Sequence, residues 1–210
     1  AEPCYAETLD WMLCDGLAAL GRPDGESLYL RLSTRPVDQS PWLAARVRLD
    51  AAQLRADVLA GGYRLVEPSS TRDTHVVIAS CGAVLPEAVH AAAALEHEGV
   101  AATVIDLTSA DRLYRQWRQS LRGASATGRH PARGEVHLAA LIPPAERRSP
   151  IITVHDAASH ALAWIGSVFG QRCLPVGVDG FGQSGAVVDV YRSFDMLPDQ
   201  IVNAALVALE

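Results

Sequence analysis

Four groups of residues in this sequence have side chains and spacings that could support chemistry. Arg35 directly follows a strand-like segment, where its planar guanidinium could bind a carboxylate or a phosphate. His155 and Asp156 could form an acid–base or metal site, because a carboxylate orients an imidazole. Residues 180–185 read Gly-x-Gly-x-x-Gly, and residues 111–122 carry four arginines at helical spacing.

The glycine-rich segment Gly180-Phe181-Gly182-Gln183-Ser184-Gly185 matches the dinucleotide-binding fingerprint only when its context is ignored. A Rossmann unit needs a following helix and another strand that ends in an acidic residue, and only 25 residues remain, most of them in helical patterns. The same loop is close to a nucleophile elbow around Ser184, but all seven histidines precede that serine. We expect a tight turn after a strand, and a nucleotide-binding oxidoreductase is an alternative that rests on this motif only.

The histidines are not arranged as metal ligands. His155 and His160 are five residues apart, a spacing that does not place two ligands on one helix face, and no third ligand lies near them in the sequence. We expect Asp156 or Ser159 to cap the start of a helix instead. The sequence therefore predicts neither a metal site nor a catalytic residue.

The arginine-rich segment Asp111-Arg-Leu-Tyr-Arg-Gln-Trp-Arg-Gln-Ser-Leu-Arg122 predicts an amphipathic helix with Leu113, Trp117 and Leu121 on its apolar face. Residues 111–148 have a net charge of +5, whereas the rest of the chain has −11. Such a patch could dock an acidic partner, but a solvated face or internal salt bridges explain it more simply. The overall charge of −6 argues against a nucleic-acid binder.

All 18 basic residues are arginine, and the 210-residue chain contains no lysine. This excludes Schiff-base chemistry, a P-loop lysine and a Ser–Lys nucleophile pair within these residues. The composition, with 49% hydrophobic and 20% charged residues, is that of a globular chain with a sizeable core.

The cysteines and the chain ends bear on the cellular compartment. The four cysteines are far apart and form no Cys-x-x-Cys motif, so we expect reduced, buried thiols in a cytoplasmic protein. The sequence contains neither a membrane span nor a signal peptide pattern. It begins without Met in a helix-like segment, and we therefore expect a piece of a longer protein.

The N-terminal part predicts one helix–turn–strand step. Apolar residues recur at three- and four-residue intervals over residues 5–20, and Gly21 follows, as at the end of an amphipathic helix. Residues 27–33 have the composition of a strand that a proline ends, and residues 37–47 are expected to form a linker. We interpret this step as the end of an α/β domain whose earlier strands are absent from this chain.

The remaining residues predict alternating strands and helices. Strands that are separated by helices of about twelve residues form parallel crossover units, so we expect a three-layer α/β fold with a mostly parallel sheet. Residues 123–134 have the composition of a flexible surface loop. The predicted strands are residues 63–66, 74–80, 101–107, 151–154 and 173–178, and the predicted helices are residues 51–60, 86–97, 158–169 and 198–210.

Several segments together resemble a known family. Residues 178–184 (Val-Asp-Gly-Phe-Gly-Gln-Ser) and 198–209 (Pro-Asp-Gln-Ile-Val-Asn-Ala-Ala-Leu-Val-Ala-Leu) resemble the end of the homodimeric pyruvate dehydrogenase E1 component, a thiamine-diphosphate enzyme related to transketolase. Residues 3–17 and 27–34 are similar to the last helix and strand of the family's pyrimidine-binding domain, and residues 61–65 to the entry of its C-terminal domain.

The resemblance implies a division of the chain and a role for it. Residues 1–50 would be the tail of a pyrimidine-binding domain, and residues 51–210 a transketolase-type C-terminal domain. The magnesium motif of the family, Gly-Asp-Gly followed by Asn, does not occur here, and the chain's one asparagine is Asn203. We therefore expect no cofactor on this chain and no activity of the piece alone, with thiamine diphosphate and Mg²⁺ bound by the full-length enzyme.

The expected parent enzyme decarboxylates a 2-oxo acid and passes the acyl group to a lipoyl carrier. Its partners would be the rest of the E1 chain, a second copy in a homodimer and a lipoyl acyltransferase. Arg35 matches an arginine that faces the substrate in transketolase-like relatives, and Asp179, Gly180, Phe181, Gly182 and Ser184 match the family's loop. The sequence departs from the E1 pattern at residues 35–39 and at Gly185. The alternative is a free-standing interaction module that binds through the arginine-rich helix.

Overall fold

A five-stranded sheet forms the centre of the computed structural model, which describes residues 1–69, 72–128 and 136–210. The strand order is β1-β3-β2-β4-β5. Strands β3, β2, β4 and β5 are parallel, and β1 pairs with β3 in the antiparallel direction. The strands are β1 (Tyr63–Val66), β2 (His75–Ser80), β3 (Ala101–Asp106), β4 (Ile151–Val154) and β5 (Cys173–Val176).

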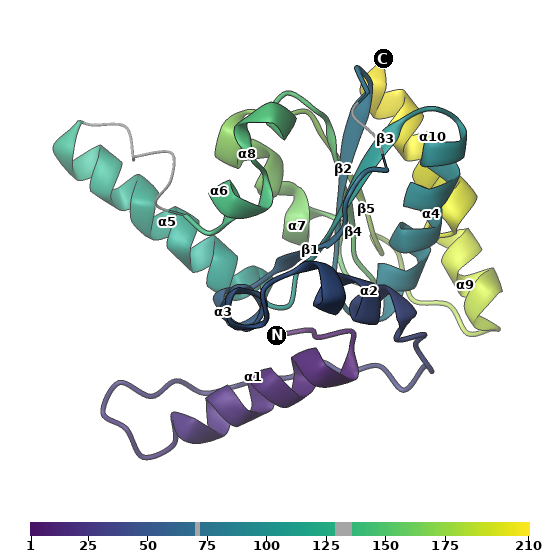
Figure 1. Cartoon of the computed structure of the whole chain (residues 1–210). Coiled ribbons are helices and arrows are strands. Elements are labelled where there is room, and N and C mark those ends of the chain that lie inside the picture. The colour runs from purple at the N-terminus through teal and green to yellow at the C-terminus, as the bar shows by residue number, and fades with distance from the viewer. Residues whose placement is uncertain (70–71, 129–135) are drawn as a thin grey trace.

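Helices cover both faces of this sheet and form the outer layers of a three-layer α/β fold (Figure 1). Helices α4 and α10 pack on one face, and α7 packs on the other. The N-terminal residues lie beneath the carboxyl ends of the strands. The helices are α1 (Ala6–Ala18), α2 (Ser40–Arg48), α3 (Ala51–Ala60), α4 (Leu85–His97), α5 (Ala110–Thr127), α6 (Leu138–Leu141), α7 (His160–Ala163), α8 (Ile165–Phe169), α9 (Val187–Ser193) and α10 (Pro198–Leu209), with short 3₁₀ turns at Gly82–Val84 and Pro144–Glu146.

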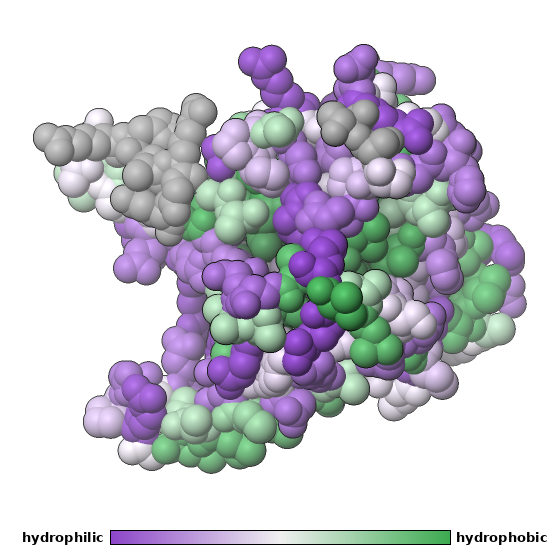
Figure 2. Space-filling model, in the orientation of Figure 1, coloured by the Kyte–Doolittle hydropathy of each residue, from purple (hydrophilic) through white to green (hydrophobic). Residues whose placement is uncertain are grey.

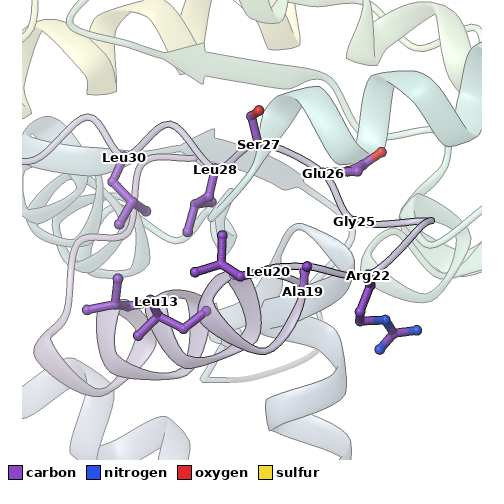
Figure 3. Close-up of a pocket in the computed structure, with 12 residues that line it drawn as sticks. Leu13, Ala19, Leu20, Arg22, Gly25, Glu26, Ser27, Leu28 and Leu30 are labelled. Atoms are coloured by element: carbon purple, nitrogen blue, oxygen red, sulfur yellow. The ribbon is translucent and has the colours of Figure 1, made fainter.

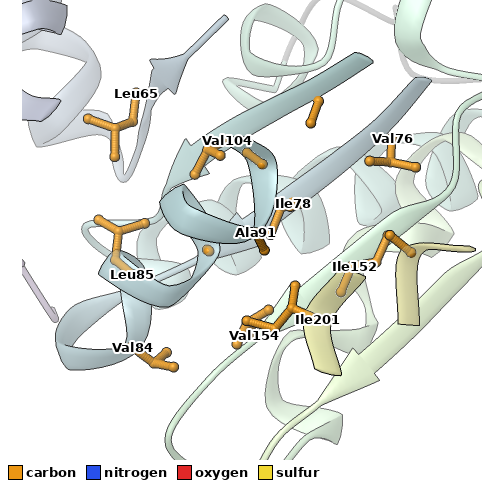
Figure 4. Packing of buried hydrophobic residues seen from close by; sticks show 14 of the residues in the cluster. Leu65, Val76, Ile78, Val84, Leu85, Ala91, Val104, Ile152, Val154 and Ile201 are labelled. Carbon is orange, nitrogen blue, oxygen red and sulfur yellow. The ribbon is translucent and has the colours of Figure 1, made fainter. Parts of the chain in front are cut away.

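The strands are apolar because both of their faces are buried. Every residue of β3 and β4 is buried, as expected for central strands of a parallel sheet that is covered on both sides. Figure 4 shows Ile78, Val104 and Ile152 of three neighbouring strands packed in one cluster with Ala91 of α4 and Ile201 of α10. This packing holds the carboxyl ends of β2, β3 and β4 in fixed positions.

The predicted order of strands and helices in residues 51–210 is confirmed, and so is the mostly parallel sheet. Helix α3 ends where the sequence predicts, at Gly61, which has φ of 125°. A Cβ atom at Gly61 would lie 2.8 Å from the carbonyl oxygen of Ser109, so only glycine fits this turn into β1.

The prediction of a strand at residues 27–33 is wrong. This segment is extended but is not part of a sheet, because the described part of the chain offers no neighbouring strand to pair with it. It packs on helix α1 instead, and Figure 3 shows Leu28 and Leu30 directed toward Leu13 and Leu20. An apolar cavity of about 440 Å³ lies between the segment and the helix.

The prediction of a linker at residues 37–47 is also wrong in its second half. Helix α2 begins at Ser40 with Pro41 in its first turn, where proline is tolerated. Its Trp42 is buried among Tyr5, Trp11 and Tyr63, with ring centroids 5.3–6.1 Å from theirs. Aromatic packing against β1 therefore stabilises a helix in a segment whose sequence is typical of a linker.

Two helices differ in extent from the predictions. The helix expected at residues 158–169 is divided at Trp164 into α7 and α8. Helix α5 continues to Thr127 and ends at Gly128, which adopts the left-handed conformation at φ 64°. Residues 123–127 of the expected loop are therefore helical, and residues 129–135 lie outside the described part of the chain.

The four cysteines are free thiols with different exposure. Cys81 is buried, Cys4 and Cys173 are partly buried and Cys14 is exposed, so the expectation of buried thiols holds fully for Cys81 and is wrong for Cys14. Among the described residues, no helix combines the length and the apolar character that crossing a bilayer requires.

Candidate functional site

The carboxyl ends of the parallel strands bring several polar side chains together. Cys81 directly follows β2, Asp106 is the last residue of β3, and His155 directly follows β4. Open α/β sheets bind ligands at this edge, because the loops that follow the strands diverge there. All three residues are buried. The edge is therefore the candidate functional site of the chain.

Residues from the N-terminus cover this edge. The amide of Glu2 donates a hydrogen bond to the carbonyl of Thr108 at 2.8 Å, and the amide of Gly82 donates to the carbonyl of Glu2 at 3.1 Å. The Glu2 carboxylate lies against His155, whose Nε2 is 3.1 Å from each carboxylate oxygen. The N-terminal segment thus occupies a place that would otherwise be open to a ligand.

Arg31 links the Glu2 carboxylate to Asp156. Its Nη1 lies 2.7 Å from Glu2 Oε2 and 2.6 Å from Asp156 Oδ1, and its Nη2 donates to the Asp156 carbonyl at 3.0 Å. Burial alone would raise the pKa of Glu2, but hydrogen bonds and charge from His155 and Arg31 outweigh it and lower this pKa to about 2. Glu2 is therefore an anion across the physiological range.

Asp156 and Ser159 do not act as the helix caps that the sequence predicts. The Asp156 carboxylate is paired with Arg31, and the Ser159 side chain makes no capping hydrogen bond to α7. The Asp179 carboxylate accepts a hydrogen bond from the Ser159 amide at 2.9 Å instead. Asp179, a residue of the predicted loop, thereby anchors the start of that loop to the beginning of α7.

The rest of the predicted loop is exposed. Gly180, Gly182 and Ser184 are exposed, and the Phe181 side chain is 93% exposed. None of the glycines at 180, 182 and 185 has a positive φ. The loop therefore lacks the left-handed glycine conformations of a phosphate-binding nest.

Arg35 pairs with Glu87 in the first turn of α4 rather than with Glu2. Its Nη2 is 2.8 Å from Glu87 Oε1 and its Nη1 is 3.1 Å from Glu87 Oε2, so the pair is bidentate. The guanidinium carbon is 5.6 Å from the centre of the Tyr191 ring. The hydrogen bond to Glu87 raises the pKa of Arg35. Arg35 also lines a cavity of about 220 Å³ with Cys4 and Gly82, and its substrate-binding role stays a prediction.

Asp106 is the most deeply buried ionisable side chain at this edge. It is fully buried, and neither of its carboxylate oxygens has a hydrogen-bond partner among the described residues. The hydroxyls of Tyr63 and Ser80, its neighbours on β1 and β2, also have no partner there. Burial raises the pKa of Asp106 to about 7.

The arginines of α5 are partly engaged within the chain. Arg112 pairs with Asp15 at 3.0 Å, and Arg115 pairs with Glu26 at 2.8 Å. These two contacts confirm the interpretation as internal salt-bridge partners. Arg118 and Arg122 are exposed further along the helix.

One group of described residues has side chains that could hold a metal ion: Glu2, Cys81 and His155. Of these, only His155 stands in a sequence pattern that suggests a ligand, and its spacing from His160 predicts no metal site. Glu2 and Arg31 belong to no sequence motif. Only the contact of Glu2 with His155, 153 residues away, and that of Arg31 with Asp156, 125 residues away, identify them as residues of the site. The one signal for this site in the sequence is that Cys81 and His155 directly follow two apolar strands.

Comparison with known proteins gives a consistent assignment. Residues 61–197 match the transketolase-like TK C-terminal domain family. The plasmid-encoded and the chromosomal transketolase of Cupriavidus necator are each 29% identical to this chain in an alignment of 209 positions that covers 95% of this chain and 26% of the relative. The chain thus spans about a quarter of the length of these relatives.

The transketolase of Leishmania mexicana has a similar fold. Its structure matches with a TM-score of 0.51 and 21% identity, over 74% of this chain and 19% of that chain. The family match covers more than half of the sequence and all five strands of the sheet. The chain therefore belongs to the transketolase-like C-terminal domain family.

Proposed function

We propose that this chain is the C-terminal part of a thiamine-diphosphate-dependent, transketolase-like enzyme, in which it supports the dimer and the mouth of the active site. The observation that carries the proposal is the covered carboxyl edge of the sheet. Glu2 and Arg31 lie where α/β domains usually bind ligands. The sheet thus holds the N-terminal segment of this chain at the edge where a substrate would otherwise bind.

The residues at the carboxyl edge do not suit thiamine diphosphate. Its diphosphate group needs a divalent cation and cationic donors, but Arg31 is paired with Glu2 and Asp156, and Arg35 is paired with Glu87. Cofactor binding is therefore assigned to other parts of the full-length enzyme, and no catalytic step is assigned to this chain.

The surface of α1 supports assembly with further protein. Leu13 and Leu17 of α1 are 43% and 56% exposed, and Leu20 and Tyr29, which follow the helix, are 69% and 77% exposed. Figure 2 shows this apolar surface along the helix. Residues 1–50 accordingly form the tail of a pyrimidine-binding domain in our proposal, residues 51–210 form the C-terminal domain, and a second copy completes a cytoplasmic homodimer.

Two reaction classes are compatible with such a parent enzyme. The similarity to the Cupriavidus necator transketolases favours a transferase of the transketolase type. The resemblance of residues 178–184 to the pyruvate dehydrogenase E1 component keeps 2-oxo acid decarboxylation, with a lipoyl acyltransferase as partner, as the second candidate. The comparisons do not support this second reaction, so the transferase is preferred.

Co-expression with the polypeptide encoded directly upstream tests the proposal. The two parts should co-purify, bind thiamine diphosphate with Mg²⁺ and transfer a ketol unit from a ketose phosphate, while pyruvate with an artificial electron acceptor gives no turnover. Turnover of pyruvate would select the E1 alternative. A chain that stays alone, with no cofactor-binding polypeptide encoded upstream, would refute the proposal and favour a free-standing module that docks through Arg118 and Arg122.

Replacing Arg35 by alanine in the assembled enzyme is expected to raise the KM for an anionic substrate by about tenfold or more, because one charge-assisted hydrogen bond is lost. Replacing Glu87 by glutamine should lower the KM, since the charge of Arg35 is then no longer neutralised. Steady-state kinetics of both variants measure these opposite effects.

A change in KM that reflects substrate binding must be distinguished from one that follows from a loss of stability of the variant. Arg46 pairs with Glu7 and lies over the Trp11 ring, so Arg46→Ala is a matched control that removes a paired, ring-stacked arginine at another place. Unchanged KM and kcat in Arg35→Ala would show that Arg35 only joins the N-terminal segment to α4.

A further inference from the structure

Three side chains of different chemistry meet at the carboxyl edge of the sheet. A carboxylate oxygen of Glu2, the thiol sulfur of Cys81 and an imidazole nitrogen of His155 all lie within 4.8 Å of one another. They come from three distant parts of the chain, and the structural similarity to transketolase assigns them no role. We propose that they bind a zinc ion, which fastens the N-terminal segment to the sheet.

The distances suit a tetrahedral ion. His155 Nε2 is 3.1 Å from Glu2 Oε2, and Cys81 Sγ is 3.9 Å from the same oxygen. Zinc bonds of about 2.0–2.3 Å to nitrogen, oxygen and sulfur place neighbouring ligand atoms roughly 3.3–3.8 Å apart. The three atoms therefore need only small movements to surround one ion, and water would be the fourth ligand.

The backbone holds the ligands in place without the ion. Cys81 and His155 directly follow β2 and β4, which are neighbouring parallel strands in a fixed register. The main-chain hydrogen bonds of Glu2 to Thr108 and Gly82 bring its carboxylate to the same edge. A site with ligands on rigid elements loses little conformational entropy when the metal binds.

The charges of the cluster also suit a divalent cation. Glu2 and Asp156 contribute two negative charges, and Arg31, which contacts both of them, contributes one positive charge. On binding the ion, the Cys81 thiol would release its proton to solvent, and the cluster would then carry two negative charges that Zn²⁺ neutralises. Arg31 remains as a hydrogen-bond partner of the Glu2 carboxylate, as ligating carboxylates in metal sites usually have.

The ligand types select zinc over the common hard cations. Mg²⁺ and Ca²⁺ prefer oxygen ligands alone, whereas a thiolate, an imidazole and a carboxylate together suit Zn²⁺.

The imidazole Nδ1 of His155 is buried and makes no hydrogen bond to the described residues. The site would hold the N-terminal segment in place, and this role does not depend on the enzyme to which the chain belongs.

Metal titration of the purified chain tests the proposal. After treatment with a chelator, the chain should bind one equivalent of Zn²⁺ by calorimetry. Co²⁺ should give a thiolate-to-metal charge-transfer band in the near ultraviolet and visible bands typical of tetrahedral coordination. Cys81→Ser should abolish the charge-transfer band, and Glu2→Gln and His155→Gln should each weaken Zn²⁺ binding at least about tenfold, since loss of a mere supporting group already costs that much.

The matched control is Cys14→Ser, which removes the exposed cysteine of α1 and should leave the spectrum and the affinity unchanged. Glu2→Gln alters a residue near the chain end, so it keeps the test valid if Cys81→Ser or His155→Gln fails to fold. The proposal is wrong if Zn²⁺ does not bind with a stoichiometry of one, or if Cys14→Ser rather than Cys81→Ser removes the cobalt band.

Discussion

Replacing Trp42 by alanine is expected to lower the free energy of unfolding by about 3–5 kcal/mol, the usual cost of removing a large aromatic side chain from a core. Trp42 is 2% exposed, packs against Tyr5, Trp11 and Tyr63, and donates a hydrogen bond from Nε1 to Glu7 at 2.9 Å. For a domain of this size the unfolding midpoint should fall by roughly 10 °C. Denaturant and thermal unfolding followed by circular dichroism measure both quantities.

The same variant tests how the chain is divided into domains. The ring of Trp42 contacts Tyr63 across the proposed boundary at residue 50. If residues 1–50 fold cooperatively with the rest, a single transition shifts as a whole. Val47→Ala is the matched control on the same helix, because Val47 is 89% exposed and its loss should change the stability by no more than about 0.5 kcal/mol. A small, separate first transition in Trp42→Ala would show that residues 1–50 unfold independently.

Replacing Asp106 by asparagine is expected to stabilise the protein increasingly as the pH rises from about 4 to 7. Burial raises the pKa of Asp106 from its ordinary 3.8 to about 7, so the folded state holds the proton more tightly than the unfolded state. The folded protein therefore loses stability relative to the unfolded chain as the pH rises through this window, by about 4 kcal/mol in total. Asparagine has no proton to lose and removes this dependence.

The measurement is the difference in unfolding free energy between Asp106→Asn and the wild type at a series of pH values. The difference should grow between pH 4 and 7 and stay constant above pH 7. Any cost of burying the asparagine amide is the same at every pH and does not change the shape of this profile. Asp10→Asn replaces an exposed aspartate of α1 and is the matched control for the substitution itself. A flat profile for Asp106→Asn would show that the carboxyl ionises in the folded state as it does in the unfolded chain.

The fold of residues 51–210 follows from local sequence patterns. Apolar runs such as residues 75–80 and 101–106 are buried on both faces, so their composition alone marks them as central strands. Gly61 and Pro198 mark the end of α3 and the start of α10 by their own backbone preferences. These signals act within a few residues and need no knowledge of distant contacts.

The structure of residues 1–50 follows less closely from the sequence, because it depends on which neighbouring segments are present. Residues 27–33 have a strand's composition, yet a strand forms only where another strand supplies hydrogen bonds, and here the segment packs on α1. Residues 40–48 look like a linker, but the burial of Trp42 against β1 makes them a helix.

The sequence by itself determined the order of strands and helices and the resemblance to transketolase-like enzymes, since both depend on residues that are close together in the chain, and its composition excluded lysine chemistry. The tertiary structure alone decided the candidate site. Glu2 and His155 are 153 residues apart, and Arg31 and Asp156 are 125 apart. Only the packing of the N-terminal segment on the carboxyl edge of the sheet brings their charges into contact, and no local pattern encodes such a contact.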